Sequence, residues 1–599
     1  MPIDFRNTNT VWASVLVETL YRLGLTTAVI CPGSRSAPLA IAFAQHPTVE
    51  AIPVLDERCA AFFALGLARQ TRRPTALICT SGTAGANFYP AVIEARESRI
   101  PLLVLTADRP PELRECNAGQ TVDQQKLYGS YPNWYSELAV PALDRALLAY
   151  LRQTLVHAWE RSQYPVPGVV HLNLPFRDPL IPIPQPAAQA FAADFDLDHF
   201  FHPDIKQAEP RSAAVPDIAA FIARLKSHSP SGSPGDGIII AGVAQPRSPR
   251  EYCDAIAYLA KTLGFPVLAE GLSPVRNYVE LNPYIITTYD PLLRHAETAE
   301  RLAPKLLIRV GEMPTSKELR QWLTHTQPLQ WIIDEGDRNL DPLSLKTVHW
   351  RLSIEQLAAA LQSHLSHQDP PFLRPPISTA YLDDWLTVNA TIRQRMDTQF
   401  HNTERLFEGK VVWMLSQCLP AQTPLFIANS TPVRDMEWFW QPGDRQIQPF
   451  VNRGANGIDG TLSTALGLAH RNQSSVLLTG DLALLHDTNG FLLRHHFQGH
   501  LTIVLMNNNG GGIFELLPIA QFDPPFEEYF ATPQFIDFAQ LCTTYGVEHI
   551  RIQSWQELAQ RLNPLPVSGI RVLEIVSDRK IDAQMRLEIL NEISSRDRQ

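Results

Sequence analysis

Two polar motifs near the C-terminus could hold a cation and a phosphate group. The first contains Asp481 and follows the apolar residues 475–479. The second contains Asn508 and Gly510 and follows the apolar residues 501–506. We expect both apolar runs to be buried parallel strands, and open α/β sheets bind ligands at the carboxyl ends of such strands. A carboxylate, a side-chain amide oxygen and a backbone carbonyl would give a hard cation three oxygen ligands. The pattern therefore predicts a magnesium site that also binds a diphosphate.

Each motif alone is typical of an ordinary turn, because Gly, Asn and Asp are common turn residues. Their combination is less ordinary, since each follows a buried strand and Asn508 comes 27 positions after Asp481. This spacing resembles the metal-binding motif of enzymes that use thiamine diphosphate.

A glutamate in the N-terminal third is a second candidate for chemistry. Residues 54–68 predict the end of a strand followed by an apolar, alanine-rich helix, with Glu57 at the junction. A carboxylic acid on an apolar surface can hold or share a proton near neutral pH. An acid at a helix start is also favoured by the helix dipole alone, so this position by itself favours the structural interpretation.

The surrounding motifs favour catalysis. Three further turns containing glycine or proline, at residues 31–39, 80–90 and 105–111, follow expected strands in the same third of the chain. With the strand end before Glu57 they give four strand ends that bear polar or cationic groups. We expect these to form the rim of an active site.

Together these motifs resemble one family closely, the 2-succinyl-5-enolpyruvyl-6-hydroxy-3-cyclohexene-1-carboxylate synthases, which are thiamine-diphosphate enzymes of menaquinone and phylloquinone biosynthesis. The resemblance covers nearly the whole chain. Generic thiamine-diphosphate decarboxylases share only the metal motif and the glutamate, so the arginine-bearing segments indicate this family. The segments that carry the resemblance are residues 32–36, 56–58, 80–84, 107–113, 429–430, 452–460 and 507–514.

The resemblance implies that the chain binds thiamine diphosphate with Mg²⁺ or Mn²⁺. It implies that Glu57 promotes the imino tautomer of the cofactor's aminopyrimidine, whose nitrogen then deprotonates C2, and that the bulky Ile458 bends the cofactor. The implied metal ligands are Asp481, Asn508 and Gly510. The implied cofactor-binding residues are Ser34, Thr80, Ser81, Gly82, Thr83, Gly457, Ile458, Gly480, Asp481, Leu482, Asn508, Ile513 and Phe514.

The reaction implied by the resemblance is decarboxylation of 2-oxoglutarate and conjugate addition of the product carbanion to isochorismate. Both substrates are dicarboxylates, which the planar guanidinium of arginine binds well. The implied substrate-binding residues are Arg35, Arg109, Gln120, Lys317, Ser430, Arg434 and Arg453. Which arginine meets which carboxylate stays open.

Two positions depart from the pattern of some family members. Gly119 stands where those members have asparagine, and Glu318 stands where they have arginine. The roles of those two family residues therefore do not transfer to this chain.

Length and composition agree with a three-domain enzyme. The chain has 599 residues, too many for one core, with 45% hydrophobic and 19% charged residues and no apolar run long enough to cross a bilayer. A net charge of −10 without a basic cluster argues against nucleic acid as a partner. Seven cysteines without a CxxC pair favour free thiols in the cytoplasm.

The alternation of apolar strands and amphipathic helices predicts three doubly wound α/β domains with mainly parallel sheets. We place a pyrimidine-binding domain at 1–182, a central domain at 216–366 and a diphosphate-binding domain at 380–599, joined by linkers at 183–215 and 367–379. In related enzymes the glutamate and the metal motif meet across a subunit boundary. The resemblance therefore implies an obligate homodimer or a dimer of dimers, such as a homotetramer.

Two alternatives remain at this level. One is another thiamine-diphosphate 2-keto acid decarboxylase or carboligase, such as one that makes acetolactate. The other is a catalytically silent binding protein with the same fold. An NAD-dependent dehydrogenase has little support, because no GxGxxG motif follows a strand in the central domain.

Overall fold

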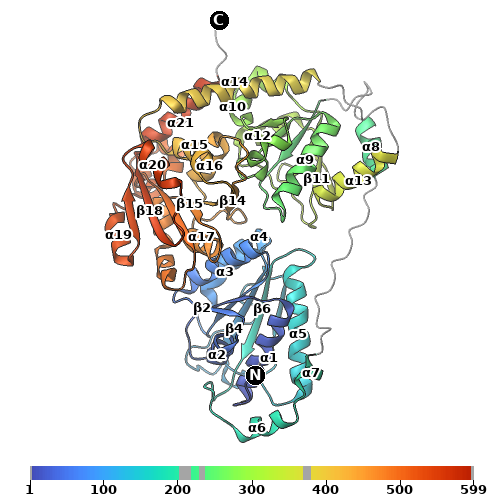
Figure 1. Cartoon of the computed structure of the whole chain (residues 1–599), viewed down its shortest axis with the longest axis vertical. Coiled ribbons are helices and arrows are strands. Elements are labelled where there is room, and N and C mark those ends of the chain that lie inside the picture. The colour runs from blue at the N-terminus through green and yellow to red at the C-terminus, as the bar shows by residue number, and fades with distance from the viewer. Residues whose placement is uncertain (1–2, 202–217, 228–235, 368–378, 595–599) are drawn as a thin grey trace.

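The computed structural model describes residues 3–201, 218–227, 236–367 and 379–594. These residues form three α/β domains, each built on one six-stranded sheet (Figure 1). Every strand pairing in the described ranges is parallel. The predicted fold class is therefore confirmed.

The N-terminal domain lies lowest in Figure 1 and has the strand order β2-β1-β3-β4-β6-β5. The order changes direction between β1 and β3, and such a switch opens a crevice at the carboxyl ends of the two strands. Its strands are β1 (Thr27–Ile30), β2 (Glu50–Pro53), β3 (Thr75–Cys79), β4 (Leu102–Asp108), β5 (Trp134–Glu137) and β6 (Val169–Pro175). Its helices are α1 (Thr8–Leu23), α2 (Ala37–Gln45), α3 (Glu57–Thr71), α4 (Tyr89–Glu97), α5 (Arg145–Gln163), α6 (Pro186–Ala193) and α7 (Leu197–Phe200).

The C-terminal domain repeats this topology with the order β14-β13-β15-β16-β18-β17, so its switch lies between β13 and β15. Its strands are β13 (Pro424–Ile427), β14 (Gln448–Val451), β15 (Ser475–Gly480), β16 (His500–Asn507), β17 (Glu548–Arg551) and β18 (Gly569–Val576). Its helices are α14 (Ala380–Asn402), α15 (Glu408–Cys418), α16 (Thr431–Phe439), α17 (Thr461–Ala469), α18 (Asp481–Leu485), α19 (Phe538–Tyr545), α20 (Trp555–Leu562) and α21 (Arg579–Ser594).

The central domain has the order β12-β11-β10-β7-β8-β9. The strands predicted at 238–242, 306–311 and 330–334 are confirmed to within one residue. Its strands are β7 (Gly237–Ala241), β8 (Val267–Ala269), β9 (Ile285–Ile286), β10 (Leu306–Val310), β11 (Leu329–Ile333) and β12 (Lys346–Trp350). Its helices are α8 (Ile218–Ser227), α9 (Pro249–Leu263), α10 (Tyr289–Leu293), α11 (Ala296–Arg301), α12 (Lys317–Thr326) and α13 (Ile354–His367).

The first predicted linker is partly wrong. The proline-rich run ends in a helix, α6, that starts at Pro186, because proline suits the first turn of a helix. Phe191, Phe195 and Phe200 then pack against the core of the N-terminal domain, so this segment belongs to that domain. The rest of that linker, most of the loop predicted at 229–237 and most of the linker at 367–379 lie outside the described residues.

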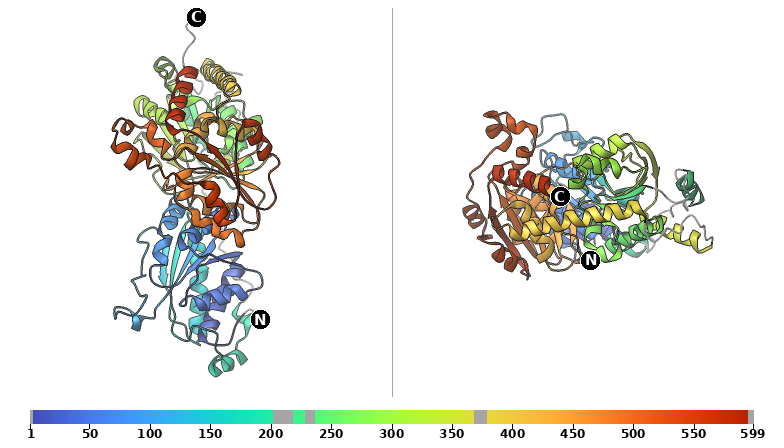
Figure 2. Two further views of the ribbon diagram at one scale, coloured as in Figure 1. Left: turned by 90° about the vertical axis from the view of Figure 1, so that its left-hand side faces the viewer. Right: turned by 90° about the horizontal axis from the view of Figure 1, so that it is seen from above.

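Helix α14 joins the central and C-terminal domains. Seen from above, it runs across both (Figure 2). Asn389 accepts hydrogen bonds from the backbone amides of Thr287 and Thr288 in the central domain, while Asp397 accepts one from the indole of Trp413. The start of the third domain at residue 380 therefore stays a prediction. Although α14 has 23 residues, neither it nor any other helix in the described ranges is long and apolar enough to span a membrane.

The N-terminal domain meets the C-terminal domain where α3 crosses α17. A Cβ atom built at Gly66 would lie 2.1 Å from the backbone oxygen of Thr464, and one built at Gly467 would lie 2.2 Å from that of Phe63. The two helices thus pack backbone against backbone, an approach that only glycine permits.

This crossing predicts that Gly467→Ala destabilises the protein although alanine favours a helix. We expect a loss of about 1–3 kcal/mol in the free energy of unfolding, because the clash is with backbone atoms that cannot rotate away. Urea and thermal unfolding of Gly467→Ala should be compared with Gly443→Ala, where an added Cβ has no neighbour within 4 Å. If Gly467→Ala unfolds with the same free energy as the wild type, α3 and α17 can move apart without cost, and their close packing is not needed for stability.

Candidate active site

The two metal motifs meet at one edge of the C-terminal sheet. Strands β15 and β16 are paired in a register that sets Gly480 opposite Met506, so the residues after both strands lie side by side. Asp481 is 4% exposed, and its Oδ2 atom accepts a hydrogen bond of 2.7 Å from the backbone amide of Gly510. Burial raises the pKa of Asp481 to about 7, although the amides of Leu482 and Gly510 oppose the shift. The predicted juxtaposition of Asp481 with the glycine-rich turn is therefore observed.

Asn508 presents an unused oxygen to the same place. Its Nδ2 atom donates to Oε1 of Glu408 at 2.6 Å, while its Oδ1 atom is buried and has no hydrogen-bond partner in the described part of the chain. A buried carbonyl oxygen without a donor is expensive unless a ligand satisfies it. This oxygen and the Asp481 carboxylate are the hard donors that Mg²⁺ prefers.

The glycine-rich turn itself needs glycine. Gly510 has a φ angle of +144°, and a Cβ atom there would lie 2.5 Å from the backbone oxygen of Ala531. Within the described ranges no cluster of three or more His, Cys, Asp or Glu could hold a metal. The donor set that we observe, one carboxylate with amide and backbone oxygens, fits a cation whose remaining ligands come from a diphosphate.

These residues line a cavity of about 280 Å³ at the switch between β13 and β15. All of its wall comes from the C-terminal domain. Gly457 lies next to it, since its backbone oxygen accepts a hydrogen bond from Asn429 in the wall. The predicted residues that line the cavity are Ser430, Arg434, Arg453, Ile458, Gly480, Asp481, Leu482, Asn508, Gly510, Ile513 and Phe514.

Two arginines stand in the cavity wall. Arg434 donates to the backbone oxygen of Ser430 at 2.6 Å, and Arg453 donates to Oδ1 of Asn429 at 3.0 Å. Burial lowers the pKa of Arg434, and the neighbouring charge of Arg453 lowers it further. Two partly buried cations whose charges affect each other favour an anionic ligand in the cavity that they line.

Lys317 is not part of the cavity wall. It is the exposed first residue of α12. Its neighbour Thr315, however, accepts a hydrogen bond of 3.3 Å from Arg453, so the loop before α12 reaches the arginine pair.

The predicted N-terminal residues form a second cluster after the carboxyl ends of β1, β2, β3 and β4. Glu57 is the half-buried first residue of α3, after the N-cap Asp56. Burial raises the pKa of the Cys79 thiol, and the charge of Glu57 adds to that shift, which places Glu57 near the end of β3. Thr80, the next residue, has a buried hydroxyl without a hydrogen-bond partner in the described residues.

The cationic part of this cluster surrounds Ser81. Arg109 donates to the Ser81 hydroxyl at 2.7 Å, and the Gln120 side chain donates to the Ser81 backbone oxygen at 2.9 Å. Arg35 is 7% exposed, and burial together with the nearby Arg109 lowers its pKa. Ser34, Gly82 and Thr83 belong to the same two turns, with Ser34 and Thr83 exposed.

The structure therefore brings the predicted residues together in two groups rather than one. Glu57, Arg35, Arg109 and Gln120 belong to the N-terminal cluster, and none of them lines the cavity that holds Asp481 and Asn508. The cavity holds the predicted metal ligands but not Glu57, and the N-terminal cluster holds Glu57 but no predicted metal ligand.

Sequence reasoning missed several residues of the cavity. Glu408, Thr431, Asn456 and Met506 line it, and Glu408 bonds directly to Asn508. Glu408 lies 100 positions before Asn508 at the start of an ordinary amphipathic helix, so no local motif indicates it. Only an alignment of related sequences could have revealed it.

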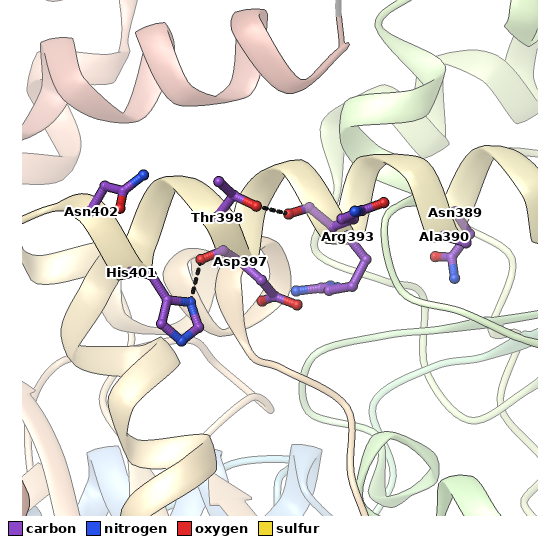
Figure 3. A pocket seen from close by; sticks show the side chains of 8 residues that line it. Asn389, Ala390, Arg393, Asp397, Thr398, His401 and Asn402 are labelled. Atoms are coloured by element: carbon purple, nitrogen blue, oxygen red, sulfur yellow. Dashed lines mark hydrogen bonds between the residues drawn. The ribbon is translucent and has the colours of Figure 1, made fainter.

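A separate hollow lies along α14, and it holds none of the predicted site residues. His401 bonds to the backbone oxygen of Asp397, as the close view shows (Figure 3). Arg393 contacts Thr287, and Asp397 is held by Trp413. The contacts of Arg393 and Asp397 hold α14 to its neighbours, whereas that of His401 lies within the helix.

Comparison with known proteins agrees with this geometry. Models of the thiamine pyrophosphate enzyme family match in chain order, with the N-terminal TPP binding domain at residues 11–127, the middle domain at 231–427 and the C-terminal TPP binding domain at 438–568. The N-terminal match contains Glu57, Arg35 and Arg109, and the C-terminal match contains Asp481 and Asn508, whereas Ser430 and Arg434 of the cavity wall lie just before it.

Curated relatives match over the whole length. A 2-succinyl-5-enolpyruvyl-6-hydroxy-3-cyclohexene-1-carboxylate synthase of Nostoc sp. is 59% identical, with 99% of each chain covered. Proteins of the same name from Trichodesmium erythraeum, with 99% of each chain covered, and Synechococcus sp., with 98% of this chain and 96% of the relative covered, are 57% and 54% identical. From the two clusters of site residues, the three matched domains and the sequence identity of 54–59% to these relatives, we conclude that the chain belongs to the 2-succinyl-5-enolpyruvyl-6-hydroxy-3-cyclohexene-1-carboxylate synthase family of thiamine-diphosphate enzymes.

Proposed function

We propose that this chain decarboxylates 2-oxoglutarate and adds the remaining four-carbon unit to isochorismate, giving 2-succinyl-5-enolpyruvyl-6-hydroxy-3-cyclohexene-1-carboxylate and CO₂. The observation that carries the proposal is one cavity that combines the oxygen donors for a cation with a pair of arginines. The names of the relatives favour neither a different carboligase nor a silent fold. The reaction would be a step in menaquinone or phylloquinone biosynthesis.

Asp481, Oδ1 of Asn508 and the backbone of Gly510 would hold Mg²⁺ or Mn²⁺, with the diphosphate beside them. Thiamine diphosphate, when bound, supplies the carbanion chemistry at its C2 atom. The branched side chain of Ile458 stands in the cavity wall and would set the bend of the cofactor, with Ile513 and Phe514 as further apolar wall.

Glu57 would hold or share a proton at the aminopyrimidine ring. It starts α3, and its charge helps to raise the pKa of the thiols of Cys31 and Cys79, which lie at the ends of β1 and β3. Ser34, Gly82 and Thr83 in the adjacent turns would contact the same ring.

The arginines would bind the substrate carboxylates. Arg434 and Arg453 face the cavity of one half-site, while Arg35 and Arg109 belong to the other. A dicarboxylate needs a cation at each end, so arginines on both sides of the cofactor suit two dicarboxylate substrates. Lys317, which is exposed and lies outside the cavity wall, is a weaker candidate for binding a substrate carboxylate.

The complete site would form between two copies of the chain. Glu57 does not line the cavity of its own chain, and Leu55 beside it is 67% exposed. Phe522, Tyr529 and Phe535, which follow the metal motif, are 63%, 69% and 80% exposed. We take these exposed apolar residues as candidates for the contact through which a twofold dimer would join each N-terminal cluster to the partner's cavity. A dimer of dimers would also bring the N-terminal cluster of one chain to the cavity of another.

The chain's thiols support a reducing environment. All seven cysteines are free, and most are buried. We assign the protein to the cytoplasm on this ground.

The activity predicts turnover that depends on both substrates. Purified protein with thiamine diphosphate and Mg²⁺ should release CO₂ from 2-oxoglutarate and give the succinyl adduct, followed by mass, when isochorismate is present. Turnover of pyruvate alone would support the carboligase alternative, and no turnover of any 2-keto acid would support a silent fold.

The shared site predicts complementation between two inactive variants. Glu57→Gln and Asp481→Ala should each lose activity by about 10²-fold or more, because each removes one half of the site. When the two variants are unfolded together and refolded, half of the dimers are mixed, and each mixed dimer has one intact site. We expect recovery to about a quarter of wild-type activity. Variants refolded separately and then assayed together are the control, and no recovery in the mixture would place the site within one chain.

A further inference from the structure

Glu408, the first residue of α15, is a buried carboxylate in the wall of the metal cavity. It is 1% exposed, and both of its oxygens are occupied. Oε1 accepts from Nδ2 of Asn508 at 2.6 Å and from the Ser577 hydroxyl at 3.4 Å, and Oε2 accepts from Arg586. Both oxygens thus already accept hydrogen bonds from the protein, so we treat Glu408 as a partner of Asn508 rather than as a ligand of the cation.

The contact with Asn508 fixes which end of that amide enters the cavity. An ionised carboxylate only accepts hydrogen bonds, so the amide must turn its NH₂ group toward Glu408. Its oxygen then points the other way, and this is the buried Oδ1 atom that has no partner among the described residues. An amide turned by half a rotation would offer N–H groups to a cation, which repel it.

We propose that Glu408 is a positioning residue that holds Asn508 with its carbonyl oxygen, rather than its amide nitrogen, toward the divalent cation. This inference rests on the proposed function, because it concerns the cation of the same site. Residues that orient a metal ligand commonly change metal affinity by about 10–100-fold when they are altered.

The carboxylate is itself held by a rigid network. Arg586 from α21 bonds to Glu408 and makes two bonds of 2.8 Å to Asp435 on α16, all three side chains being 1% exposed or less. Burial opposes the charge of Arg586, yet the two carboxylates hold its pKa above the usual value. Asp435 directly follows Arg434, so the same network joins the metal ligand to the helix that bears a substrate arginine.

The test is a substitution that keeps the shape and removes the obligatory acceptor. In Glu408→Gln, Arg586 donates its hydrogen bond to the new amide oxygen, because a guanidinium can only donate. The amide nitrogen then faces Asn508 and turns Asn508 around. We expect the affinity for Mn²⁺, measured by electron paramagnetic resonance of free Mn²⁺ with thiamine diphosphate present, to fall about 10–100-fold.

A second variant should reverse the loss. In Glu408→Gln/Asn508→Asp, the new aspartate accepts from the glutamine with one oxygen and offers the other to the cation. Its Mn²⁺ affinity should exceed that of either single variant. In Asn508→Asp alone, the new carboxylate and Glu408 repel each other, and neither can donate a hydrogen bond to the other. The matched control is Glu437→Gln, which removes another buried carboxylate of the domain, one bonded to Arg276 and absent from the cavity wall. Its Mn²⁺ affinity should be unchanged.

Thermal unfolding of the proteins without cation separates positioning from a merely structural role. Unchanged Mn²⁺ affinity in folded Glu408→Gln would overturn the inference, as would a double variant that binds no better than Asn508→Asp. If Glu408→Gln alone does not fold, the comparison of the double variant with Asn508→Asp still tests whether Glu408 orients Asn508. Wild-type protein that binds no Mn²⁺ in the presence of thiamine diphosphate would instead contradict the proposed function.

Discussion

The parallel register of β13, β15 and β16 is the constraint on which the candidate site depends. It brings the ends of three strands to one edge of the C-terminal sheet, so that Ser430, Asp481 and Asn508 line one cavity. A parallel strand cannot slip by one residue without turning its buried side chains to the other face. The apolar cores on both faces of the sheet therefore fix the positions of the polar residues at its edge.

Buried charge makes the wall of this cavity stiff. Taking Arg586, Glu408 and Asp435 out of water costs free energy, and removing one partner of such a buried group typically costs about 3–5 kcal/mol. The network also ties the C-terminal helix α21 to α15 and α16. A site that must aim one amide oxygen at a cation benefits from such rigid support.

The loop that carries Arg453 depends on all three domains. Glu94 of the N-terminal domain accepts hydrogen bonds from the backbone amides of Gly454 and Ala455. Thr315 of the central domain and Asn429 of the C-terminal domain accept from the Arg453 side chain. The central domain thus contributes to the site by helping to place an arginine, although none of its described residues lines the cavity.

Much of this protein follows from its sequence alone. Continuous apolar runs predicted the parallel strands, and polar residues directly after them predicted where ligands bind. The position of Asp481 and Asn508 after neighbouring strands is such a case, because strand ends of a parallel sheet lie at one edge whatever the rest of the chain does. The arginine-bearing segments predicted the family. The helix at Pro186 was missed, because its Ala188 is buried and its Phe191 packs on a core formed by segments distant in the sequence.

Only the tertiary structure decided how these parts meet. It left Glu57 outside the wall of its own chain's cavity, and it packed α3 on α17 through glycines that bring two domains together. It also placed Glu408 against Asn508 across 100 positions of sequence. Local patterns determine strands, turns and the residues at their ends, whereas contacts between distant segments depend on how whole domains pack, and that packing has no local signature.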